Sequence, residues 1–222
     1  MSAQDQANIA NIQRPFLEYR AIFNDPITSF WYGARHGEVI GSMMKALSPW
    51  QLSLENISWN QAPKNLAEAQ VTFTLPALFA SIQLSMAGIN ASAINPDWSR
   101  VKQFVSLFQT GVDTLKAVVA QELKSQHTTL GFHVTPNVRP FREIMSRFIN
   151  TKELHAEDAN MFGISAYYGD FSFVIDGSAV FPESVFIKLS RAYSPATRFE
   201  EMAGTIYKDE ENVLQLLDLK LQ

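Results

Sequence analysis

The sequence contains no cysteine and no long apolar run, and its 22 acidic residues outnumber its 18 lysines and arginines. Without cysteine the chain forms no disulfide, thiolate nucleophile or thiolate-ligated metal centre. No apolar segment approaches the roughly eighteen residues of a membrane-spanning helix. The first residues also lack the basic start and apolar core of a signal peptide. We therefore expect a cytoplasmic protein with no membrane segment.

The acidic balance also disfavours a nucleic-acid partner. Proteins that grip phosphate backbones draw affinity from clustered lysine and arginine, whereas the net charge here is −4. Arg139, Arg142 and Arg147 do cluster around a predicted short helix after Pro140. We interpret them as a solvated helix face.

Motifs of catalysis and cofactor binding are missing as well. The chain has no Gly-x-Ser-x-Gly elbow, no phosphate-binding glycine loop and no dinucleotide fingerprint. The string Arg35-His36-Gly37-Glu38 resembles the signature of histidine phosphatases. In that family the string follows a parallel strand, whereas here it lies inside a predicted helix. We interpret His36 as an ordinary helix residue and predict no catalytic residues and no cofactor, which favours a non-enzymatic protein.

The remaining histidines offer one candidate metal site. His127 and His133 share a face of a predicted strand but stand roughly 20 Å apart, too far to chelate one ion. Glu153, His155 and Glu157 bring nitrogen and oxygen ligands close together in the sequence. An exposed acidic segment is the favoured interpretation, and a divalent cation bound by these three residues is the alternative.

Periodicity between residues 71 and 134 predicts a fold class. Alternating apolar residues predict strands over 71–75 and 82–86. The string from Asn95 to Trp98 predicts a helix start, because it combines a capping side chain, a proline and an acid. Apolar residues at three- and four-residue spacing then extend this helix to about Leu123. A strand over 127–134 follows.

The rest of the chain predicts further strands and helices. The expected strands are 17–23, 50–54, a hairpin around Gly169-Asp170 and a strand over 185–189. The expected helices are 27–47 and one after Pro195, and a helix is favoured over a strand for 212–222. Gly33, Gly37 and Gly41 recur every fourth residue, which predicts close packing of the first helix on the sheet.

This order predicts an α+β fold in which mostly antiparallel sheet packs against long amphipathic helices. Two similar helix-on-sheet halves are a further hypothesis. The expected parts are a polar N-terminal tail over 1–15, a half over 16–137 and a half over 138–222, and one continuous domain remains an alternative.

Several of these segments together resemble a known family. A strand over 16–23, the string Ile94-Asn95-Pro96-Asp97-Trp98 before a long helix, and Leu130-Gly131-Phe132 in the next strand are similar to a sporadically distributed family of bacterial proteins without assigned function. The resemblance covers residues 16–135 and implies the same topology. It transfers no catalytic residue, and the arginine that the family carries near His133 is absent here.

The functional prediction follows from these observations. We expect a non-enzymatic protein-interaction or assembly component that self-associates, because sheet edges can pair with another chain. The alternatives are a small-molecule-binding protein or enzyme, with a site between helix 96–123 and the sheet, and an acidic immunity protein or antitoxin. A deep pocket that joins two titratable side chains there, for example His133 and a carboxylate, would favour the enzyme.

Overall fold

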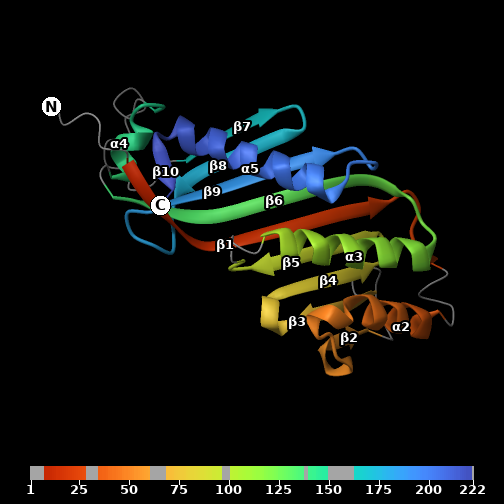
Figure 1. The fold of residues 1–222 in the computed structure, drawn as a ribbon. Helices are drawn as coiled ribbons and strands as arrows, with labels where there is room; N and C mark the ends of the chain where they lie inside the picture. The colour runs from red at the N-terminus through yellow and green to blue at the C-terminus, as the bar shows by residue number, and fades with distance from the viewer. Residues whose placement is uncertain are drawn as a thin grey trace. The chain divides into compact units, whose positions relative to one another are not determined.

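A computed structural model describes residues 8–28, 35–60, 69–96, 101–137, 140–149 and 163–221. The predicted class is confirmed, since the fold is α+β with a large, mainly antiparallel sheet and four α-helices in the described ranges (Figure 1). None of these helices has the length and apolar character needed to cross a bilayer. The chain divides into a first unit of residues 1–15, 129–191 and 204–222 and a second unit of residues 16–128 and 192–203.

The second unit is a helix-on-sheet layer. Its strand order is β2-β3-β4-β5-β1-β6, and α2 and α3 lie on one face of the strands (Figure 1). The bounds of these elements are β1 Asn8–Phe23, α2 His36–Leu47, β2 Ile57–Trp59, β3 Gln70–Leu75, β4 Ala80–Ser85, β5 Gly88–Ile94, α3 Val101–Val119 and β6 Leu123–Pro136. Strands β1 and β6 continue into the first unit.

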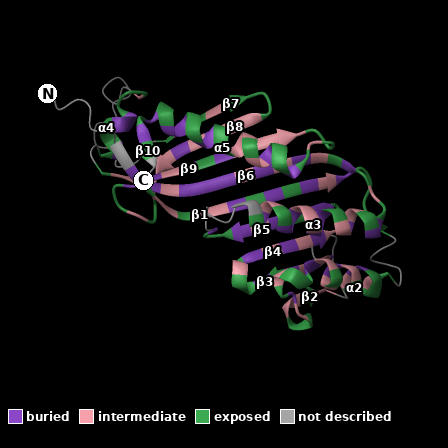
Figure 2. Cartoon of the chain, in the orientation of Figure 1, coloured by how far each residue is buried: buried purple, intermediate pink, exposed green. Residues whose placement is uncertain are grey.

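Alternation of side chains explains why this layer forms. Along β3 and β4 every second residue is buried beneath the helices, and the residues between them are partly or fully exposed (Figure 2). Helix α3 presents seven apolar residues to the core, namely Phe104, Leu107, Phe108, Val112, Leu115, Val118 and Val119. At Gly111 an added Cβ would lie 2.2 Å from Ile82 Cδ1, so the helix backbone packs directly on β4.

The first unit is built on a predicted hairpin. Tyr168 pairs with Phe171 across Gly169, whose φ of +61° suits glycine. In this unit β6 is followed across the sheet by β9, β8 and β7, and β10 pairs in parallel with the start of β1. The bounds are α4 Phe141–Met145, β7 Gly163–Tyr168, β8 Phe171–Gly177, β9 Val185–Tyr193, α5 Phe199–Leu216 and β10 Leu219–Leu221.

Several predicted boundaries were wrong at the ends of elements. The strand expected from Leu17 begins at Asn8, because its polar start pairs with β10 and needs no apolar alternation. The helix expected to reach Leu123 ends at Val119, and β6 starts at Leu123. The segment 212–222 was predicted as helix, but α5 ends at Leu216 and β10 follows.

Two strands were misplaced or missed. The segment 50–54 is not a strand, because short 3-10 turns occupy Ser48–Trp50 and Leu54–Asn56 and the strand comes later as β2. Strand β5 was not predicted, since its small residues give weak alternation. The glycine interpretation was also wrong where the structure describes it, because an added Cβ at Gly37 or Gly41 meets nothing within 4 Å.

Candidate functional site

The candidate metal ligands Glu153, His155 and Glu157 lie outside the described residues. Within the described ranges, no group of three or more histidines, aspartates or glutamates is arranged to hold a metal ion.

The Arg35-His36 string has structural contacts in the second unit. His36 begins α2, and its ring centroid lies 4.2 Å from that of Trp59. Arg35 pairs with Glu38 at 2.9 Å and donates a 2.5 Å hydrogen bond to the carbonyl of Val118. The hydrogen bond from Arg35 lowers the pKa of the Glu38 carboxyl. Arg35 therefore ties the start of α2 to the end of α3.

His133 packs against two aromatic rings in the first unit. Its Nδ1 is 2.9 Å from Ser178 Oγ, and its ring centroid lies 5.2 Å from that of Phe181 and 5.0 Å from that of Phe186. Burial and the nearby charge of Arg14 lower the pKa of His133. No carboxylate of the described residues forms a hydrogen bond or ion pair with it, so the structure does not bring together the acid–base pair considered for this residue.

Strand β7 is an exposed edge of the first unit. It pairs with β8 on one side, and no described strand pairs with its other side. Every residue of β7 is exposed or partly exposed (Figure 2), and Tyr167 and Tyr168 expose 79% and 62% of their surface. Its sequence, GISAYY, contains no charge and no proline. Edge strands that avoid association usually carry a charged residue or a proline, and β7 carries neither.

Aromatic stacking fixes one side of this edge. The ring of Tyr168 lies 6.4 Å from that of Phe171 and 6.2 Å from that of Phe173. The guanidinium of Arg191 lies 4.8 Å above the Phe171 ring. Because successive strand residues face opposite sides, Tyr167 projects from the other face. The edge therefore presents an ordered aromatic residue on one side and a free one on the other.

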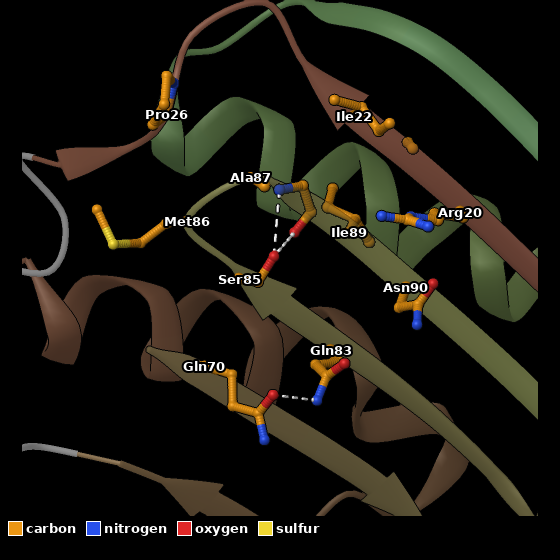
Figure 3. A pocket seen from close by; sticks show the side chains of 12 residues that line it. Arg20, Ile22, Pro26, Gln70, Gln83, Ser85, Met86, Ala87, Ile89 and Asn90 are labelled. Atoms are coloured by element: carbon orange, nitrogen blue, oxygen red, sulfur yellow. Dashed lines mark hydrogen bonds between the residues drawn. The ribbon is translucent and has the colours of Figure 1, made fainter. Parts of the chain in front are cut away.

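A hollow of about 420 Å³ opens on the sheet face of the second unit that α2 and α3 do not cover (Figure 3). Its polar side chains come from four strands, with Arg20 on β1, Gln70 on β3, Gln83 on β4 and Asn90 on β5. Figure 3 shows these side chains on the viewer's side of the strands, with helices behind. The sequence carries a signal for this face in the polar residues that alternate with the core residues of β4, but sequence analysis did not single them out.

A buried carboxyl lines a second cavity, in the first unit. Glu210 on α5 is 7% exposed, and its Oε1 has no hydrogen-bond partner among the described residues. Burial raises the pKa of Glu210 to about 7. The cavity has a volume of about 430 Å³, and its lining includes Leu214 and Leu219.

The raised pKa of Glu210 predicts a pH-dependent stability. The folded protein favours the protonated Glu210 carboxyl, because its pKa is higher than the unfolded-state value of 4.5. This contribution to stability is complete below pH 4.5 and is lost as the pH rises through about 7. Glu210→Gln is therefore expected to raise the free energy of unfolding at pH 8 by on the order of 1–3 kcal/mol, and to change little at pH 4. Urea unfolding at both pH values measures this. Glu211→Gln, at the exposed neighbour, is the control, and an equal pH dependence in wild type and Glu210→Gln would contradict the assignment.

No protein-family model matches the chain, and the search of curated proteins found no match. Function is therefore inferred from the residues and their geometry.

Proposed function

We propose that this chain is a non-enzymatic protein-interaction or assembly component that associates with a second copy of itself through the β7 edge. The observation that carries the proposal is the uncharged edge, whose outer side pairs with no described strand. The unpaired backbone N–H and C=O groups of an edge strand bind another strand readily. A second β7 in antiparallel orientation would continue the sheet.

The composition of the edge suits pairing with an identical strand. Because β7 carries no charge, two copies meet without like-charge repulsion. Tyr167 is 79% exposed, and pairing would bury apolar surface of its ring that now contacts water. The edge at the far side of the second unit differs, since β2 has only three residues. A strand that short offers few backbone groups for pairing, so association is assigned to β7.

The other interpretations have less support. A ligand site between helix 96–123 and the sheet is disfavoured by the direct packing of Gly111 on Ile82. An immunity protein or antitoxin is supported by the net charge of −4 alone. A cytoplasmic location and two similar helix-on-sheet halves with long amphipathic helices are part of the proposal and follow from the sequence patterns.

A charge placed on the edge tests the proposal. Tyr167→Lys is expected to weaken self-association at least about tenfold, because it replaces an exposed aromatic side chain by a charge, and lysine on an edge strand opposes pairing with another strand. Sedimentation velocity over a range of protein concentrations measures the dissociation constant. Leu54→Lys is the matched control, since Leu54 is 67% exposed and lies in the second unit. A wild-type protein that stays monomeric, or a Tyr167→Lys variant that associates as wild type does, would contradict the proposal.

A further inference from the structure

The uncovered face of the second unit carries an inference beyond self-association. We propose that its hollow binds a small organic anion, whose carboxylate pairs with Arg20 and accepts hydrogen bonds from the neighbouring amide side chains. The site lies on the opposite face of the sheet from α2 and α3 (Figure 3).

Strand register places the polar groups of the site together. Thr72 pairs with Gln83, Gln83 with Asn90, and Asn90 with Arg20. These four residues form one row across β3, β4, β5 and β1, and paired residues in a sheet have Cβ atoms about 5 Å apart. A ligand lying along the row would therefore reach the guanidinium and several amide groups at once.

The hydrogen bonds already made leave donors and an acceptor unused. Gln83 Nε2 donates to Gln70 Oε1 at 2.7 Å. Whichever way the two amides are oriented, one amide group donates and one carbonyl accepts in this contact. The pair therefore keeps one free NH₂ group and one free carbonyl. Asn90 forms no side-chain hydrogen bond with a described residue, so its amide is available as well.

Arg20 supplies the positive charge of the site. Its side chain is exposed and forms no hydrogen bond or ion pair with any described residue. Glu18 lies two residues earlier on the same face of β1, and Ser92 is its partner on β5. Among the described residues, Glu18 and Arg20 form no ion pair. A guanidinium presents parallel N–H donors that match the two oxygens of a carboxylate.

Strands β1 and β5 pack closely at one end of the hollow. Gly88 is the partner of Ile22, and an added Cβ there would lie 2.0 Å from the carbonyl oxygen of Ala21. No side chain therefore occupies the position between Ser85 and Ile22. The lining includes apolar residues beside this gap, among them Ile22, Pro26 and Met86.

Size and charge together define the ligand class. A volume of about 420 Å³ lies within the roughly 300–1,000 Å³ of small-molecule sites. Arg20 is the one charged residue in the described lining, so a monoanion fits better than a polyphosphate. The apolar residues favour a compact apolar body attached to the carboxylate.

Benzoate is a suitable probe, and benzamide is its neutral counterpart of the same shape. In ¹⁵N-edited NMR titrations of the full chain, benzoate is expected to shift amide signals of β4, β5 and the 20–22 segment. Benzamide is expected to bind at least about tenfold more weakly, because it lacks the charge that pairs with arginine.

Two variants connect binding to the arginine. Arg20→Gln is expected to weaken benzoate binding about tenfold or more. Arg20→Lys is expected to restore part of the binding, because lysine keeps the positive charge but lacks the parallel N–H donors of the guanidinium. Arg198→Gln is the matched control, because Arg198 is exposed and pairs with Glu201 elsewhere in the unit. The proposal is overturned if benzoate produces no shifts in these strands up to its solubility limit, if benzamide binds equally well, or if Arg20→Gln binds benzoate as wild type does. Thermal melting of each variant verifies that it is folded.

Discussion

Replacing Gly88 by alanine is expected to lower the free energy of unfolding by about 3 kcal/mol. The new Cβ would lie 2.0 Å from the carbonyl oxygen of Ala21 and 3.0 Å from Ile22 Cα, so it overlaps backbone atoms that no rotamer change can move. Strands β1 and β5 must then separate at their register pair Ile22↔Gly88. Urea unfolding followed by circular dichroism measures the loss.

The same substitution at Gly41 is the control and has the opposite expected sign. Gly41 lies inside α2, and an added Cβ there meets nothing within 4 Å. Alanine favours a helix by up to about 1 kcal/mol over glycine, so Gly41→Ala is expected to stabilise the protein slightly. A Gly88→Ala variant as stable as wild type would show that β1 and β5 do not approach as closely as described.

Removing the carboxylate of Asp209 is expected to have a comparable effect. Arg191 on β9 donates from Nε and Nη2 to the two oxygens of Asp209 on α5, each at 2.7 Å. The Asp209 side chain is 8% exposed, and the Arg191 side chain is 20% exposed. The contact holds the pKa of Arg191 above its usual value. Asp209→Ala leaves a largely buried guanidinium without its main partner, and we expect a loss of about 3 kcal/mol.

Asp170 provides a control within the same ion cluster. It contacts Arg191 at 3.1 Å, but its side chain is 63% exposed. Exposed ion pairs contribute about 0–1 kcal/mol, so Asp170→Ala is expected to cost less than 1 kcal/mol. Equal losses in the two variants, measured by urea unfolding, would show that burial does not decide the strength of these contacts. The cluster also matters for the β7 edge, because Arg191 lies over Phe171, whose ring stacks on Tyr168.

The residues of the two proposed sites come together through strand pairing, which the sequence does not predict, although it predicts most of the strands that carry them. The hairpin around Gly169 was predictable, because glycine suits the positive φ and the flanking residues alternate. The position of β7 at an edge of the sheet was not predictable, because it depends on which strands pair with one another. Arg20 and Gln83 are 63 positions apart in the sequence, and no spacing rule connects them. Register alone brings them into one row with Asn90.

The sequence by itself determined the α+β class, the strands β3, β4, β7 and β8, and the absence of cysteine chemistry, because side-chain periodicity and composition act locally along the chain. The tertiary structure decided which strands became edges and which polar residues met on one face. It also decided that the small-residue segment over 88–94 is a strand and that the polar segment starting at Asn8 pairs with β10. These features depend on backbone hydrogen bonds between distant segments, and such bonds leave no periodic trace in the side chains.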